Sequence, residues 1–88
     1  MTTRKSTSPS RIETAAIASS SMSRVSYHFG KSVLQVEFHD GSVYRYFDVP
    51  IHAYRELLQA DSKGTHFNHH IRNAFTHAMG PMIDQANL

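Results

Sequence analysis

The Asp40-Gly41 pair lies between the alternating runs VLQVEF and VYRYF, and it constrains the fold of this chain more than any other feature. Asp-Gly between two such runs is the strongest short-range signal of a β-hairpin. A third alternating run, SRVSYHF, precedes them and is separated from them by the turn Gly30-Lys31-Ser32. The three runs predict an antiparallel β-meander, which needs a cover on one face to be stable.

Two helical segments follow the strands and can supply this cover. Four apolar residues of IHAYRELLQA fall at helical spacing: Ile51, Tyr54, Leu57 and Leu58. Four residues of THFNHHIRNAF form a second stripe: Phe67, Ile71, Ala74 and Phe75. Pro50 suits the first turn of the first helix, and Asp48 lies near enough to cap it. Asp61 or Ser62 can cap the second helix.

The two ends of the chain lack such a period. Residues 1–22 are rich in Ser and Thr and poor in large apolar groups, which predicts a disordered tail. Gly80-Pro81 ends any helix, so residues 77–88 are predicted to be an irregular tail and residues 23–76 the folded domain. The predicted fold class is α+β: a three-stranded antiparallel β-meander packed on one face by two short helices, with a disordered N-terminal tail.

The length of the hairpin loop decides which way Tyr44 and Tyr46 point. A two-residue loop would place both on the polar face, where bases could stack on them, and would put Arg45 on the apolar face. A three-residue loop with a left-handed glycine instead pairs Val36 with Tyr44 and Leu34 with Tyr46. The tyrosines then join the core and Arg45 points outward. Burying a guanidinium costs more than burying a phenol, which favours the second register.

Composition narrows the class of protein. The chain has 88 residues, no cysteine and a formal net charge of +2. Three of its nine basic residues lie within residues 1–21, whereas residues 22–72 hold six basic against five acidic side chains. The predicted domain is therefore nearly neutral, and a strong phosphate-binding field usually needs more charge. No apolar run approaches the roughly 18–20 residues that cross a bilayer. These features favour a cytoplasmic protein without a membrane partner.

Several short motifs occur in an order that matches a known family. They lie between residues 24 and 72 and comprise Phe38, Gly41, the Tyr-x-Tyr of Tyr44 and Tyr46, Val49-Pro50, Ser62-Lys63-Gly64, Phe67-Asn68 and Ile71-Arg72. Together they resemble the KTSC domain, found at the C-terminus of some lysyl-tRNA synthetases and as stand-alone bacterial or phage proteins. The resemblance implies RNA binding, by association with a tRNA enzyme. After Arg72 this sequence departs from the aromatic and basic ending usual in the family.

The start of the second predicted helix is the candidate nucleic-acid or anion site. Free amides at a helix N-terminus, with a glycine and a lysine beside them, favour an anion. The candidate residues are Lys63, Gly64, Asn68, Arg72 and, from the sheet, Arg45. In the alternative interpretation Ser62 is only a cap, and Gly64 only lets two helices approach closely.

Metal binding and catalysis have little support in the sequence. His66, His69 and His70 include a pair at helical spacing, but no carboxylate is spaced to complete a ligand set. We interpret them as a solvated polar face and predict no metal and no cofactor. No nucleophile elbow, paired carboxylates or glycine-rich nucleotide loop occurs, which indicates that the protein is not an enzyme.

The sequence therefore predicts a non-catalytic binding module, with RNA or single-stranded nucleic acid as ligand. The alternative is a protein-interaction or self-association module, either monomeric or weakly dimeric. Its contact surface would be the uncovered face of the sheet, with Val33, Gln35, Val43, Arg45 and Phe47.

Overall fold

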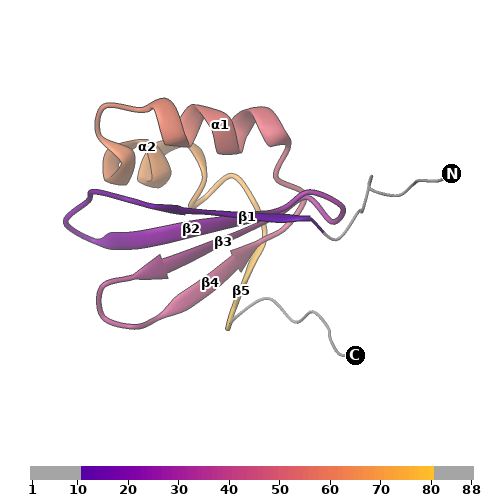
Figure 1. The fold of residues 1–88 in the computed structure, drawn as a ribbon, viewed down its shortest axis with the longest axis horizontal. Coiled ribbons are helices and arrows are strands. Elements are labelled where there is room, and N and C mark those ends of the chain that lie inside the picture. Colours follow the sequence, from indigo (N-terminus) through magenta and orange to yellow (C-terminus); the bar gives the residue numbers. More distant parts are fainter. Residues whose placement is uncertain (1–10, 81–88) are drawn as a thin grey trace, which may run out of the picture.

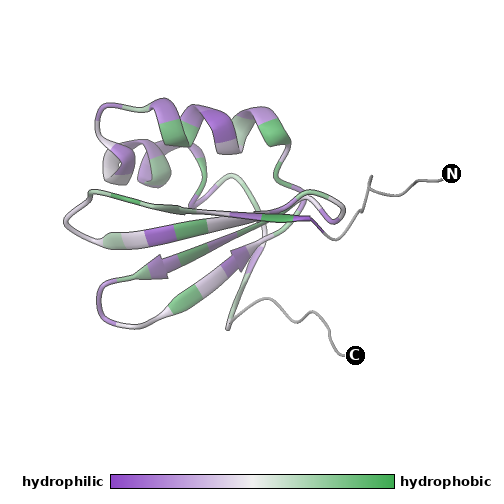
Figure 2. Cartoon of the chain, viewed as in Figure 1, coloured by the Kyte–Doolittle hydropathy of each residue, from purple (hydrophilic) through white to green (hydrophobic). Residues whose placement is uncertain are grey.

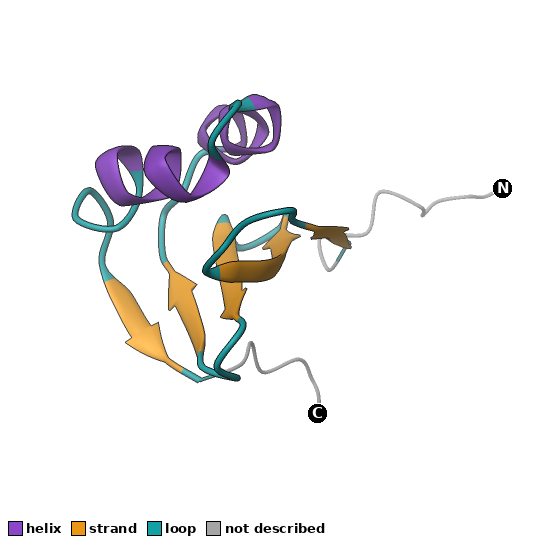
Figure 3. Cartoon of the chain, turned by 90° about the vertical axis from the view of Figure 1, so that its left-hand side faces the viewer, coloured by secondary structure: helices purple, strands orange, loops and turns teal. Residues whose placement is uncertain are grey.

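The computed structural model describes residues 11–80, which form one five-stranded antiparallel sheet and two helices (Figure 1). The strands are β1 (Ile12–Ala16), β2 (Met22–His28), β3 (Val33–Phe38), β4 (Val43–Tyr46) and β5 (His77–Met79). The helices are α1 (Ile51–Gln59) and α2 (Lys63–His70). The strands lie in chain order, and both helices cover one face of the curved sheet (Figure 3). The α+β class is as predicted, but the sheet has five strands instead of three.

Both additional strands lie in segments predicted to be irregular. β1 pairs with β2, from Ile12 opposite His28 to Ala16 opposite Arg24, and β5 pairs with β4. The prediction missed them because both are short edge strands with mostly exposed side chains. These strands are held by backbone hydrogen bonds to a neighbouring strand. Such bonds do not require alternating apolar residues, so the sequence carries no strand pattern there. The remainder of the two predicted tails, residues 1–10 and 81–88, lies outside the described residues.

The β3–β4 hairpin has the predicted three-residue register. Leu34 pairs with Tyr46, and Val36 pairs with Tyr44. The loop glycine, Gly41, has φ +92°, and its N–H donates to the carbonyl of Phe38 at 3.0 Å. Tyr46 is consequently buried in the core and Tyr44 is half-buried against it, as the sequence predicted.

The core lies between the sheet and the helices, and hydrophobic and polar residues alternate along the central strands (Figure 2). Its buried members are Ile17, Met22, Val25, Tyr27, Leu34, Val36, Tyr46, Val49, Tyr54, Leu57, Phe67 and Ile71. The predicted helical stripes supply four of these. The rings of Tyr27 and Tyr54 stack with their centroids 4.8 Å apart, which holds α1 against the C-terminal end of β2.

The helix ends differ from prediction in two places. Asp48 does not cap α1: the N-cap is Pro50, which makes no side-chain capping bond, and Asp48 itself has φ +56°. The second helix ends at His70 and not at Phe75, because Ile71 leaves helical geometry and the following residues turn toward β5. Ser62 does cap α2, since its hydroxyl accepts a hydrogen bond from the amide of Thr65 at 3.4 Å.

Candidate functional site

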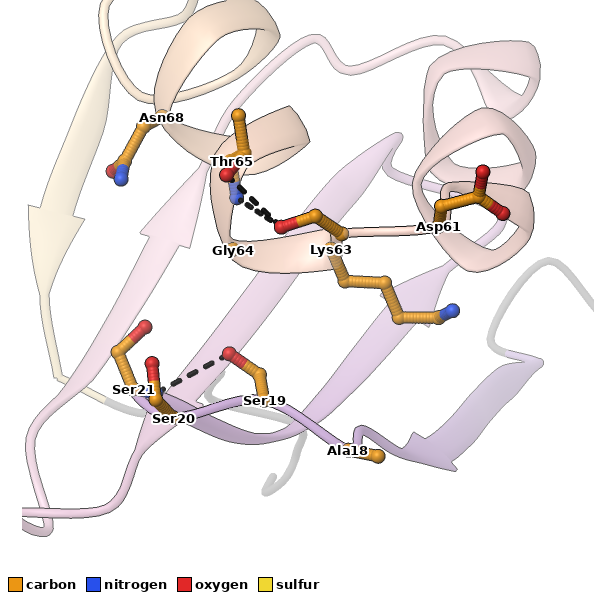
Figure 4. A pocket seen from close by; sticks show the side chains of 10 residues that line it. Ala18, Ser19, Ser20, Ser21, Asp61, Lys63, Gly64, Thr65 and Asn68 are labelled. Atoms are coloured by element: carbon orange, nitrogen blue, oxygen red, sulfur yellow. Dashed lines mark hydrogen bonds between the residues drawn. The ribbon is translucent and has the colours of Figure 1, made fainter.

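A hollow of about 350 Å³ opens where the start of α2 faces the β1–β2 connection (Figure 4). Residues 18–21 form one wall, residues 61–65 form the other, and Asn68 lies at one end. Gly64 allows the two walls to approach, because a Cβ atom there would lie 3.3 Å from the hydroxyl oxygen of Ser19. The close neighbour of this glycine is thus the strand connection, and not the other helix as the alternative interpretation expected.

The hollow is rich in hydroxyl groups, and its two charged lining residues have opposite signs: Lys63 and the exposed Asp61, whose carboxylate disfavours an anion. The Ser62 hydroxyl donates to that of Thr65 at 2.9 Å, and Ser19 accepts bonds from the amides of Ser21 and Met22. Lys63 lines the hollow, but its ammonium donates to the carbonyl of Ala60 at 2.9 Å. This lysine therefore satisfies the end of α1, and the hollow offers an anion mainly hydroxyls and helix amides.

Asn68, at the end of this hollow, and Arg72, just beyond it, lie together on an exposed side of the chain. The guanidinium of Arg72 donates to the amide oxygen of Asn68 at 3.4 Å, and both side chains are exposed. A second hollow, of about 490 Å³, lies between β4 and the end of α2 and is lined by both residues. Ser21 and Asn68 line both hollows, so the two adjoin along one side of α2.

Four of the five predicted site residues are thus brought together, and Arg45 is not. Arg45 pairs with Gln35 and with Ala78, so it points to the sheet face opposite the helices, as its register requires. Its guanidinium carbon lies 5.6 Å from the centre of the Phe47 ring. Its Nε atom is buried and has no hydrogen-bond partner in residues 11–80. Arg45 therefore belongs to a different surface from Arg72.

Sequence reasoning missed the serine wall at residues 19–21, which it placed in a disordered tail. The neighbouring Ile17 and Met22 are buried in the core, at 6% and 0% exposure, and fix this connection against the helices. Two isolated apolar residues in a Ser-rich segment were the only sequence signal. The role of Tyr44 and Tyr46 as walls of the second hollow was missed as well.

The histidines of α2 form one close pair. The rings of His66 and His70 lie 4.5 Å apart between centroids, whereas His69 and His70 are 6.4 Å apart. Burial and the charge of His70 lower the pKa of His66, and the charge of Glu56 opposes them. No group of three or more His, Asp or Glu side chains within residues 11–80 is arranged to hold a metal ion. Neither helix of this region has the length and hydropathy of a membrane-spanning segment.

Comparisons with known proteins agree on one family. The sequence model of the KTSC domain matches residues 18–75. An uncharacterized protein of Stutzerimonas stutzeri is 45% identical over 53 residues, which cover 60% of this chain and 75% of that protein. A lysine–tRNA ligase of Nostoc punctiforme is 46% identical over 50 residues, which cover 57% of this chain but only 9% of the ligase. The crystal structure of a KTSC domain protein from Yersinia pestis matches 81% of this chain and all of that one, with a TM-score of 0.74 and 25% identity.

Proposed function

This chain belongs to the KTSC domain family, and we propose that it is a non-catalytic binding module for RNA or other single-stranded nucleic acid. The observation that carries the proposal is the placement of Arg72 and Asn68 together on an exposed side, beside two adjoining hollows. Arginine recognises phosphate through two parallel hydrogen bonds, and the hollows offer polar groups to the rest of a nucleotide.

The relatives support a nucleic-acid ligand indirectly. Two of them, from Nostoc punctiforme and Trichormus variabilis, are lysine–tRNA ligases, and a segment similar to this chain makes up 9% of each. Those enzymes act on tRNA by name, which supports RNA as the ligand class to test first for this chain. For this chain the RNA ligand, the absence of catalysis and a cytoplasmic location are predictions.

The charge of the domain sets the expected strength of binding. Lys63 is bonded to Ala60, which leaves Arg72 as the principal cation of the proposed site. Each phosphate contact to a single strand changes the logarithmic salt slope of binding by about −0.7. We therefore expect weak binding that depends only shallowly on salt, with a slope of about −0.7 for the single Arg72 contact.

The test is an amide NMR titration of the full chain with a short single-stranded RNA and DNA, at low and at physiological salt. Salt-sensitive shifts at residues 19–21 and 61–72 are expected. Arg72→Gln should weaken binding, whereas Arg45→Gln removes the same charge from the opposite face and should not. Absence of shifts at low salt, or equal weakening by both variants, would contradict the proposal.

One observation favours a second function, a protein contact or self-association through the sheet face opposite the helices. Val33, which was predicted to belong to this contact surface, is buried at 7% exposure and so lies outside it. The Nε atom of Arg45 on this face is buried without a partner in the described residues, and a carbonyl or carboxylate of another chain would satisfy it. Val43 and Phe47 beside it are half-buried. Line broadening that grows with protein concentration and is confined to β3 and β4 would support this function.

A further inference from the structure

The second hollow, between β4 and the end of α2, has aromatic walls. Phe38 and Tyr44 from the β3–β4 hairpin and Phe67 from α2 line it together with Tyr46. Tyr46 lies edge-to-face with Phe67 at 5.4 Å, and Phe38 lies edge-to-face with Phe67 at 5.8 Å and with Tyr44 at 5.9 Å. Such packing fixes the rings in place, which lowers the entropy lost when a planar ligand is bound.

The hollow is also lined by a tyrosine, Tyr46, whose ring is buried in the core. Tyr46 is 3% exposed and lines the hollow, yet it makes no hydrogen bond with any residue of the described range. The Tyr46 hydroxyl is not among the fully buried polar atoms that lack a partner within residues 11–80, so we take it to reach the hollow, where a ligand can bond to it. Burial raises the pKa of Tyr46 and the charge of Arg72 partly opposes this, so the phenol keeps its proton at neutral pH and can donate it.

The remaining lining groups are polar and lie at the rim. The exposed Arg72 and Asn68 stand on one side, joined by the 3.4 Å bond between them, and Asn73 and His77 also line the hollow. Amide side chains combine donors with an acceptor, as the edge of a nucleobase does. The volume of about 490 Å³ lies within the range of roughly 300–1,000 Å³ that is usual for ligand pockets.

We propose that this hollow receives one unstacked nucleobase of a single-stranded RNA, while Arg72 at the rim binds the phosphate of the same nucleotide. The inference rests on the proposed function and adds the place of the base. Recognition of RNA commonly uses bases that are splayed out of the strand and held on aromatic side chains. The adjoining serine-lined hollow would then follow the sugar–phosphate backbone toward the start of α2.

The experiment compares a short RNA with the same strand carrying abasic sugars, which keeps every phosphate and removes the bases. Loss of a stacked base weakens binding by about 5- to 150-fold. We expect a loss in this range for the abasic strand, with shifts of the Tyr44 and Tyr46 ring protons appearing only with the intact RNA.

Two variants of the full chain locate the contact. Tyr46→Phe keeps the ring and removes one hydrogen bond, so it should weaken binding of intact RNA by about 2- to 12-fold. It should leave binding of the abasic strand unchanged. Arg72→Gln should weaken both strands, whereas the charge-matched Arg45→Gln should weaken neither. Amide shift dispersion and the melting temperature check that each variant is folded. If Tyr46→Phe is unstable, the Arg72→Gln variant and the comparison of intact with abasic RNA remain as the test.

The outcomes separate the two proposals. Equal binding of intact and abasic strands would overturn the base-binding hollow and leave nucleic-acid binding intact. Absence of binding to both strands at low salt would overturn both. A smaller difference between intact and abasic strands in Tyr46→Phe than in the wild-type chain would support both. Ring shifts produced only by an aromatic peptide, and not by RNA, would overturn the base as ligand and assign the hollow to a protein partner.

Discussion

At the centre of the β3–β4 hairpin, Arg45 is flanked by two tyrosines whose rings belong to the helix-covered face. The pairing of Leu34 with Tyr46 follows from a three-residue loop, and the alternative loop would have placed the guanidinium among apolar side chains. The register could be predicted because moving a strand by one residue exchanges its faces, and only one of the two registers places the guanidinium in the apolar core beneath the helices. The charge of Arg45 was thus sufficient to predict which face Tyr44 and Tyr46 occupy.

Gly41 is the residue on which this loop geometry depends. With φ +92° it is in the left-handed region, and a Cβ atom would meet nothing within 4 Å, so any penalty there is one of backbone strain. We expect Gly41→Ala to lower the free energy of unfolding by about 1–2 kcal/mol in urea titrations. Gly41→Asn should lose less, because asparagine tolerates this conformation. Equal stability of Gly41→Ala and the wild-type chain would show that the loop adopts another geometry.

We expect His66 to make the free energy of unfolding depend on pH. Its pKa in the folded chain is lowered from 6.5, so the unfolded chain takes up this proton first as the pH falls. The contribution of His66 is therefore complete at neutral pH and is lost below about pH 6.5. Urea titrations at about pH 7.5 and about pH 5 should show a smaller loss for His66→Gln than for wild type. His69→Gln, an exposed neighbour, is the control, and an equal acid response in both variants would refute the assignment.

At the scale of elements, strands with an alternating core face were predictable and edge strands were not. β2, β3 and β4 alternate apolar and polar residues along most of their length, and each buries apolar side chains in the core, although β4 buries only Tyr46 fully. β1 exposes four of its five residues and β5 two of its three. Both strands are held by backbone pairing with a neighbouring strand of the sheet. The sequence of a single segment does not reveal this pairing, because it depends on which strands lie next to each other in the fold.

A side-chain hydrogen bond at the edge of the core connects β1 to α1. The hydroxyl of Tyr54 donates to the carboxylate of Glu13 at 2.7 Å, while the stacked Tyr27 donates to the carbonyl of Val49 at 2.5 Å. Tyr54→Phe should cost about 1–2 kcal/mol of unfolding free energy. It should also raise amide hydrogen exchange selectively in β1.

The matched control is Tyr27→Phe, which removes a hydroxyl from the same stacked pair without touching β1. This variant leaves the buried Val49 carbonyl unsatisfied, so it should cost about 1–3 kcal/mol while β1 keeps its exchange protection relative to β3. If β1 exchanges equally fast in both variants, the Tyr54–Glu13 bond is not what holds the strand.

At the scale of the whole molecule, the candidate site is assembled from segments far apart in the chain. The serine wall at residues 19–21 faces residues 61–65 across the first hollow. The second hollow is lined by residues of β4, of α2 and of the segment that follows α2, and by His77 of β5. The α2 part of the site was predictable, because a cap, a glycine and polar residues at helical spacing lie within ten positions of one another. The other walls of the site come from strands that are distant in the sequence. Their positions depend on the order of strands in the sheet, which a local sequence pattern does not predict.

The N-terminal boundary of the folded unit follows from the same assembly. A chain beginning at Ser23 would match the boundary expected from composition, but it would lack β1, Ile17 and Met22. Ile17 and Met22 are buried, and each buried side chain of this size contributes about 1.5–3 kcal/mol. Small domains have only about 5–15 kcal/mol in total. We therefore expect the shortened chain to melt at a much lower temperature and, with the edge of β2 exposed, to self-associate in sedimentation experiments.

Two proline substitutions in the full chain separate the loss of pairing from the loss of length. The amides of Ile17 and Phe29 bond to the carbonyls of Ser23 and Arg11, so odd-numbered residues of β1 face β2 in the ladder. Ala15→Pro should therefore remove a ladder bond and cost at least about 1 kcal/mol more than Ala16→Pro, whose amide points away from β2. Equal unfolding free energies for the two variants would mean that β1 does not contribute through its pairing, and that the boundary at Ser23 is sufficient.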